Sequence, residues 1–316
     1  MAHKITNSDL IDNIYRRRNF YTMTRLFHFL ALFCALPLVF CLPALAEKNS
    51  APLPVLVSIA PQKFLLERIA GDAVSVTVLV KPGSDPHIYE PSPAQVRAAS
   101  ASQIWFTIGV PFEDVWLPRI MDNAPHLRTI SLISDIRRLN AKKEGCGHHR
   151  RDGEDPHVWL SPLLIRQMLS VITQSLCLEL PDRAADLQAK AKTLDGMLET
   201  LHAELSLSFQ SFPLERRVFL TFHPSWRYFA QDYELTELSI EVDGKEPSPK
   251  KLQEIMDRAK AHGITTVFVE PQFPKNAARA VAEALGATIV EADPLAEDLM
   301  QLYTGMGEKL VQSFAR

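Results

Sequence analysis

The sequence predicts an α/β protein made of two halves, each a parallel sheet covered by helices, with one long helix between the halves. Short β-rich runs alternate with helical runs from residue 54 to the C-terminus, a pattern typical of parallel sheets with helices on both faces. The alternation is interrupted once, by an uninterrupted helical pattern over residues 181–210. These two observations set the predicted architecture.

Each half supplies four predicted strands, and the helices follow the strands in turn. In the first half we expect strands at 54–59, 74–80, 104–109 and 127–133. In the second half we expect strands at 218–222, 237–242, 264–270 and 287–292, followed by helices at about 225–232, 249–262, 275–285 and 295–314. Gly263 and Gly286 stand where the C-terminal end of a helix favours a residue that tolerates positive φ.

The long central helix is predicted by the spacing of its leucines. They fall on a single stripe of a helix: Leu187, Leu194, Leu198, Leu201 and Leu205. About 29 residues at 1.5 Å each give a rod of roughly 43 Å, long enough to run the height of two domains. One stiff helix between the halves favours small relative motion over a wide hinge. The expected divisions are therefore 47–180, the linking helix 181–211, and 212–316.

The N-terminus reads as an export signal. Residues 23–46 contain one arginine, a short apolar run and a final Ala-Leu-Ala, so we predict cleavage after Ala46 and a periplasmic protein. Two readings of the preceding residues stay open: Met23 is the true start, or Arg16-Arg17-Arg18 belongs to a twin-arginine signal. Lipid anchoring at Cys41 is not favoured, because Phe40 occupies a position where lipoprotein signals require a small residue.

Composition and charge exclude some classes of partner. Of 316 residues, 47% are hydrophobic and 22% charged, and the formal net charge is −3, so no basic excess points to nucleic acid. We expect a monomer. After signal cleavage two cysteines remain, Cys146 and Cys177, which allow a single disulfide. Cys177 lies in an apolar helical pattern that favours simple packing.

Three histidines and one aspartate fall at the predicted carboxyl ends of strands. The segment DPHIYEPSP at 85–93 is nearly repeated as DPHVWLSP at 155–162, which places His87 and His157 in equivalent contexts. His223 and Asp293 directly follow strands of the second half. Because ligands of open α/β sheets bind at the carboxyl ends of strands, we expect these four side chains to converge across a cleft.

Two imidazoles from one half and an imidazole with a carboxylate from the other form a tetrahedral set suited to Zn²⁺. A manganese site would carry more oxygen ligands, so Mn²⁺ is the second choice. Asp85 and Asp155 are candidate hydrogen-bond acceptors for the ring N–H groups. If Asp293 does not bind the metal, three histidines and a water would instead resemble the site of a zinc-dependent hydrolase or lyase.

Taken in order, six motifs resemble the metal-binding solute receptors of bacterial ABC importers, the ZnuA-like cluster A-I family: DPHIYEPSP, DPHVWLSP, FHPSWRYFA, IEVDGKEPSPKKL, VFVEPQF and DPL. The resemblance implies two (β/α)4 lobes joined by one rigid helix, with the metal in the inter-lobe cleft. It implies that His87, His157 and His223 bind zinc, that Asp293 is the family's acidic position, and that the protein is no enzyme but delivers metal to a membrane permease.

Within the family, histidine at position 223 is similar to zinc-type members; a manganese-type receptor or adhesin is the alternative. Two departures stand out. The His-rich loop of many zinc-type members is reduced here to a short segment with His148 and His149, and Pro224-Ser225-Trp226 replaces the usual Asp-Ala-Phe. The second departure concerns the surroundings of His223 rather than the ligand itself.

Overall fold

Two four-stranded parallel sheets form the framework of the protein. The computed structural model describes residues 51–139, 154–242, 244–273 and 275–316. The first sheet has the strand order β2-β1-β3-β4 and the second β6-β5-β7-β8, and every pairing is parallel. The strands are β1 (Leu53–Val57), β2 (Val74–Val78), β3 (Ile104–Thr107), β4 (Arg128–Ser131), β5 (Val218–Thr221), β6 (Thr236–Ser239), β7 (Thr266–Val269) and β8 (Thr288–Glu291).

Both sheets therefore follow one scheme. The chain leaves the first strand, adds the second on one side, and then crosses to the other side for the third and fourth. This reversal creates a switch point at the carboxyl end of the first strand, the place where open α/β sheets bind ligands. The central strands β1, β3, β5 and β7 are mostly or wholly buried, as strands covered on both faces must be.

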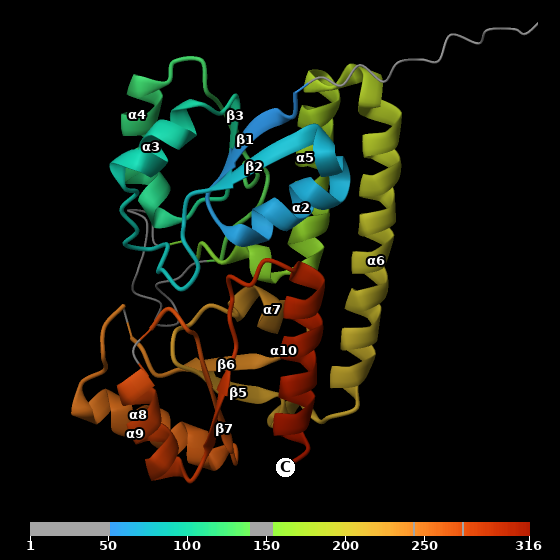
Figure 1. Ribbon diagram of the computed structural model, residues 1–316. Helices are drawn as coiled ribbons and strands as arrows, with labels where there is room; N and C mark the ends of the chain where they lie inside the picture. The colour runs from blue at the N-terminus through green and yellow to red at the C-terminus, as the bar shows by residue number, and fades with distance from the viewer. Residues whose placement is uncertain (1–50, 140–153, 243, 274) are drawn as a thin grey trace, which may run out of the picture. The chain divides into compact units, whose positions relative to one another are not determined.

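Helices connect the strands in each half (Figure 1). They are α2 (Ala60–Ala70), α3 (Pro93–Ser100), α4 (Pro111–Asn123), α5 (Pro162–Glu179), α6 (Ala184–Gln210), α7 (Arg227–Asp232), α8 (Pro249–Ala261), α9 (Lys275–Leu285) and α10 (Leu299–Phe314). Several begin as their sequences predict. Ser92, Ser161 and Ser248 each accept a hydrogen bond from a main-chain N–H of the first turn, and a proline follows each serine.

The helix α6 is the predicted long connection. It contains 27 residues and buries the expected leucine stripe. It packs against α2 and α5 of the first half and against α10 of the second, and Figure 1 shows it running beside all three. The predicted α/β fold class, with two parallel sheets and one long linking helix, is confirmed. The exact divisions at 47–180, 181–211 and 212–316 stay predictions.

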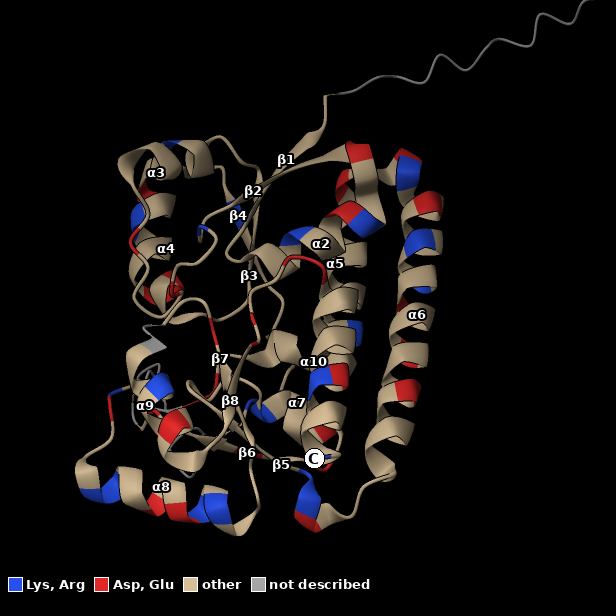
Figure 2. Cartoon of the chain, turned by 60° about the horizontal axis from the view of Figure 1, so that its bottom comes forward, with Lys and Arg blue, Asp and Glu red and all other residues tan. Residues whose placement is uncertain are grey.

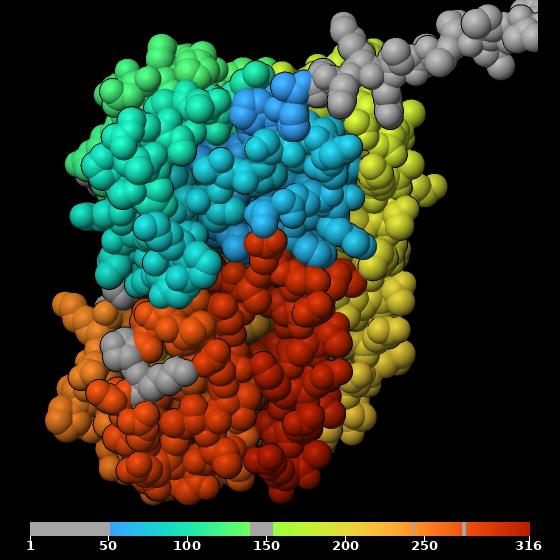
Figure 3. Space-filling view, in the orientation of Figure 1, coloured from blue at the N-terminus to red at the C-terminus, as the bar shows by residue number. Residues whose placement is uncertain are grey.

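The apolar core is not divided equally between the halves. One cluster runs from the first sheet through α5 and α6 to residues of the second half such as Phe219, Phe229 and Tyr303. A smaller cluster fills only the space between the second sheet and α8 and α9. In Figure 3 the red C-terminal residues abut the blue first half, where Lys63 Nζ lies 2.8 Å from Glu297 Oε1.

Many charged residues lie on the outer helices. Figure 2 shows lysine, arginine and acidic residues along the outer helices, notably α6 and α8. None of the helices among the described residues is both apolar enough and long enough to span a bilayer.

Candidate metal centre

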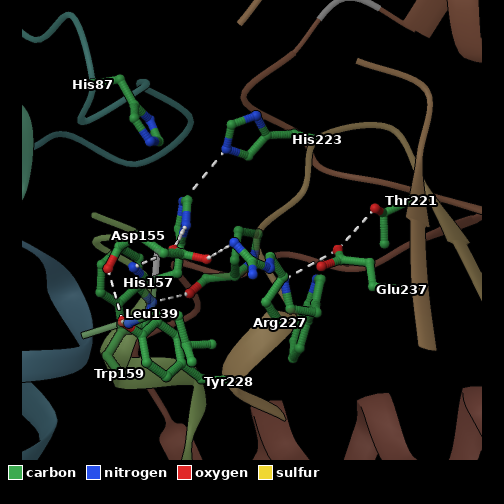
Figure 4. Close-up of polar contacts among 12 residues, drawn as sticks. His87, Leu139, Asp155, His157, Trp159, Thr221, His223, Arg227, Tyr228 and Glu237 are labelled. Carbon is green, nitrogen blue, oxygen red and sulfur yellow. Dashed lines mark hydrogen bonds and ion pairs between the residues drawn. The ribbon is translucent and has the colours of Figure 1, made fainter. Parts of the chain in front are cut away.

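Three histidine rings meet where the loops at the carboxyl ends of the strands come together. His87 lies in the loop between β2 and α3, His157 in the loop before α5, and His223 shortly after β5. One ligand nitrogen from each lies within 4.8 Å of the others. The ring centroids are 5.0 to 5.2 Å apart, and Nε2 of His157 is 3.4 Å from Nε2 of His223 (Figure 4).

Each Asp-Pro-His motif fixes its histidine through the preceding aspartate. Asp85 Oδ1 accepts the main-chain N–H of His87 at 2.8 Å and lies 2.7 Å from its Nδ1. Asp155 Oδ1 does the same for His157, at 3.0 and 2.7 Å. Because a carboxylate only accepts hydrogen bonds, Nδ1 carries the proton in both rings and Nε2 is left as the metal-binding atom.

His223 is oriented by two glutamates that sequence reasoning had not singled out. Its Nδ1 lies 3.1 Å from Glu241 Oε2, and its main-chain N–H donates to Glu270 Oε2 at 3.2 Å. Its ring also stacks on Phe273, with centroids 4.6 Å apart. Glu241 and Glu270 come soon after β6 and β7, so the rule that identified the histidines could have found them, but acidic residues after strands are too common to be decisive.

Burial governs the protonation of these groups. His157 is only 4% exposed, and burial lowers its pKa, although the nearby charge and hydrogen bond of Asp155 partly oppose this shift. Burial, together with the charge of Asp85, raises the pKa of Glu241 to about 7. Burial likewise raises the pKa of Glu270 well above its usual range. The centre thus combines a neutral imidazole with carboxyl groups whose ionisation a bound cation would favour.

Asp293 lies outside the group of three histidines. Its Oδ1 accepts hydrogen bonds from Gln272 Nε2 at 2.7 Å and from the main chain of Leu295 at 2.9 Å. Within the described residues, the only cluster of histidine, cysteine and acidic side chains with metal-binding spacing is the histidine triad. The expected fourth ligand is therefore not assembled with the other three.

The remaining histidines and cysteines have other surroundings. His202 Nδ1 lies 3.3 Å from the Tyr233 hydroxyl, and His262 is exposed just beyond the end of α8. Cys177 carries a free, half-buried thiol whose Sγ lies 3.7 Å from the Ala184 carbonyl. Cys146, His148 and His149 lie outside the described residues. The predicted alternatives for Cys177, a disulfide with Cys146 or simple packing, therefore stay predictions.

Paired parallel sheets with three convergent imidazoles form a candidate binding site for a metal ion. The family model described as "zinc-uptake complex component A periplasmic", ZnuA, matches residues 55–316, and the chain belongs to this family. It is therefore the metal-binding, solute-binding component of an ABC importer, which implies a membrane permease as partner. Members of this family are receptors and not enzymes, which sets the hydrolase or lyase alternative aside.

Individual relatives agree on metal binding but differ in the metal. A crystal structure of ZnuA is 36% identical, with a TM-score of 0.77 over 83% of this chain and 99% of its own. The zinc-binding lipoprotein AdcA of Streptococcus pneumoniae (strain R6) is 27% identical over 89% of this chain, which spans 57% of AdcA. The manganese-binding lipoprotein MntA of Halalkalibacterium halodurans is 28% identical over 77% of this chain and 79% of MntA.

The relatives also bear on the N-terminus. The family description is periplasmic, whereas AdcA and MntA are named lipoproteins. The expectation that Cys41 carries no lipid therefore gains no support from them. Residues 1–50, including the predicted cleavage site, lie outside the described residues.

Proposed function

We propose that the protein is a periplasmic zinc receptor that captures Zn²⁺ with His87, His157 and His223 and delivers it to an ABC permease. The observation that carries the proposal is the convergence of three ring nitrogens within 4.8 Å. Neutral imidazoles are good ligands for Zn²⁺, which accepts four-coordination without further geometric demands. Mn²⁺ prefers more oxygen ligands, and the group of three contains none.

The fourth coordination position falls to Asp293 or to a water molecule. Asp293 follows β8 at the same edge of the second sheet, but both hydrogen bonds to its Oδ1 come from neighbouring protein groups. An Asp293→Asn variant separates the two cases. If Asp293 binds the metal, zinc affinity falls substantially; if water does, affinity stays close to that of the wild type.

Competition titration with a zinc chelator tests the ligand set. We expect one tight zinc site per chain, weaker Mn²⁺ binding, and loss of the site in a His87→Ala, His157→Ala double variant. His202→Ala is the matched control, because this histidine lies outside the cluster. Unchanged zinc stoichiometry in the double variant would overturn the ligand assignment, and tighter binding of Mn²⁺ than of Zn²⁺ would overturn the metal preference.

Export through a cleavable signal completes the proposal. The supporting features are the apolar run before Ala46 and the periplasmic description of the family. Mass spectrometry of the mature protein from a cell envelope fraction should find Glu47 at the N-terminus. A lipidated Cys41 at the N-terminus would instead show an anchored receptor of the AdcA type.

A further inference from the structure

An arginine of the second half faces the aspartate that orients His157. Arg227 is the first residue of α7, and its Nη1 lies 3.7 Å from Oδ2 of Asp155 (Figure 4). The Asp155 side chain is fully buried, and the Arg227 side chain is only 11% exposed. A charge pair removed from water in this way interacts strongly, because the surrounding medium screens it little.

The two oxygens of Asp155 have separate roles. Oδ1 accepts both the main-chain N–H and the ring Nδ1–H of His157. Oδ2 makes no hydrogen bond with any described residue, so the ion pair with Arg227 is the contact that fixes this side of the carboxylate. The order of contacts is therefore Arg227, Asp155, His157 and the metal position.

The neighbouring residue of α7 holds the same loop. The Tyr228 hydroxyl accepts a hydrogen bond from the main chain of Leu139 and donates one to the carbonyl of Asp155, both at 2.9 Å. The start of α7 thus contacts the His157 loop through a charge and through two hydrogen bonds. Since His223 lies just ahead of α7 in the chain, this helix start links the two histidines whose Nε2 atoms lie 3.4 Å apart.

A second acid, the half-buried Glu237, is near the same arginine. Glu237 accepts hydrogen bonds at Oε1 from the main chain of Trp226 and from the Thr221 hydroxyl. Burial raises the pKa of Glu237 to about 8, and the charge of Asp155 adds to the rise whereas that of Arg227 opposes it. Arg227 is thus a cation near the buried Asp155 and the half-buried Glu237.

From this geometry we infer that Arg227 is a positioning residue of the metal centre, which holds the Asp155 carboxylate in the orientation that aims His157 at the metal. The inference rests on the proposed function, because it takes His157 as a ligand. Outer partners of ligand histidines commonly change metal affinity by about 10- to 100-fold when removed. Arg227 acts one contact further out, so its loss should lower zinc affinity about tenfold.

Zinc affinity of three variants tests the inference, each measured by chelator competition alongside thermal unfolding of the metal-free protein. Arg227→Met should bind Zn²⁺ about tenfold more weakly than the wild type. Arg227→Lys should recover part of the loss. Arg227 makes one charged contact with Asp155, at 3.7 Å, and a lysine can also supply a single positive charge. Arg217→Met is the matched control: Arg217 is buried in the same half and pairs with Glu234, away from the histidines, so its loss should leave zinc affinity unchanged.

A double-mutant cycle with Asp155→Asn completes the test. If Arg227 acts through Asp155, the double variant should bind zinc like Asp155→Asn alone, within about twofold. Additive losses, or wild-type affinity in Arg227→Met, would overturn the inference. Should Arg227→Met not fold, Arg227→Gln, which keeps polarity without charge, takes its place in the same comparison.

The outcome is separable from that of the proposed function. If His157→Ala binds zinc as the wild type does, the ligand assignment fails and this inference fails with it. If His157→Ala loses the site while the Arg227 variants do not change affinity, only the role of Arg227 is wrong. A purely structural role would lower thermal stability in Arg227→Met and leave its affinity unchanged, which also contradicts the inference.

Discussion

The two Asp-Pro-His segments have the same internal geometry but different surroundings. In both, the aspartate binds the main chain and ring of the histidine, with Nδ1–Oδ1 distances of 2.7 Å. The residue after each histidine shows the difference: Ile88 is 71% exposed, whereas Val158 is fully buried. One motif thus presents its histidine from a solvent-facing loop, and the other from the protein interior.

The contacts of the second segment explain its burial. Trp159 Nε1 donates to the Pro294 carbonyl at 2.8 Å, and the Tyr303 hydroxyl donates to the Trp159 carbonyl at 2.5 Å. The Ser161 hydroxyl donates to Asp232 at 2.6 Å. All three partners belong to the second half of the chain. His157 therefore belongs to the first half by sequence but is held by the second, together with His223.

A repeated motif specifies how a ligand is aimed and not how firmly it is anchored. The Asx-type hydrogen bonds are encoded within three residues, so both copies acquire them. Anchoring depends on the residues that pack around the loop. The second copy is held by residues of the opposite half, whereas Tyr89 of the first copy contacts Phe112 and Gln95 of its own half.

The largest expected effect comes from removing each histidine. Apparent zinc binding energies of about 10–16 kcal/mol, shared over four ligands, give roughly 2.5–4 kcal/mol per ligand, or about a 60- to 700-fold loss of affinity. We expect His87→Ala and His157→Ala to lose comparable affinity. His157→Ala should destabilise the metal-free protein more than His87→Ala does, because it leaves the fully buried Asp155 without its ring partner, whereas Asp85 is 11% exposed.

Chemical denaturation of the metal-free variants measures this second effect. Equal stability losses in the two variants would show that both histidine loops are anchored equally firmly, which contradicts the difference in their surroundings. His126→Ala, at an exposed position, is the control for a histidine without these contacts.

The residues that follow the histidines give a second test, with effects of about 2–4 kcal/mol. Val158→Ser removes buried methyl groups and adds a hydroxyl to an apolar site, and both changes are destabilising. Ile88→Ser exchanges an exposed side chain and should alter stability by no more than about 0.5 kcal/mol. The free energy of unfolding, obtained from urea titrations, distinguishes the two, and a costly Ile88→Ser would contradict the solvent-facing position of the first loop.

The aspartates provide the third test, with effects of about 1.4–2.7 kcal/mol in metal binding. Asp155→Asn should weaken zinc binding by about 10- to 100-fold, because the amide no longer supplies a charged acceptor to the His157 ring. Asp85 is 11% exposed and Asp155 fully buried, so solvent can partly replace the interaction at His87 but not at His157. We therefore expect the smaller loss in Asp85→Asn, measured by competition with the same chelator. A larger loss of zinc affinity in Asp85→Asn than in Asp155→Asn would contradict this expectation.

Much of this centre could be predicted from the sequence, for reasons visible in particular residues. His87, His157 and His223 were identifiable because strand patterns locate the carboxyl edges, and parallel sheets bring these edges together. The roles of Glu241 and Glu270 could not be ranked in advance, since their importance depends on which neighbouring ring they face. Arg227 could not be connected with Asp155 at all, because 72 residues separate them and no local pattern links them. Asp293 satisfied the same edge rule as the histidines, yet its Oδ1 is turned toward Gln272 and Leu295.

A further expected effect concerns the pH dependence of stability, through Glu237 near the second copy. Burial raises the pKa of Glu237 to about 8 from an ordinary value of 4.5. Below about pH 4.5 the carboxyl is protonated in both the folded and the unfolded chain, so it makes no difference to stability there. Between about pH 4.5 and 8 the unfolded chain releases this proton while the folded chain retains it, and stability therefore falls as the pH rises.

Glu237→Gln removes this titration and keeps an oxygen to accept from Trp226 and Thr221. The variant should match the wild type near pH 4.5 and be more stable at pH 8, because the wild type loses stability over the pH range between these two values. Glu234→Gln, at an exposed acid of the same half, is the control and should leave the pH profile unchanged. Parallel stability–pH curves for Glu237→Gln and the wild type would mean that the pKa of Glu237 is not raised by burial. Water would then reach this carboxyl, and the surroundings of the second copy would be more exposed to solvent than the burial of His157 and Asp155 indicates.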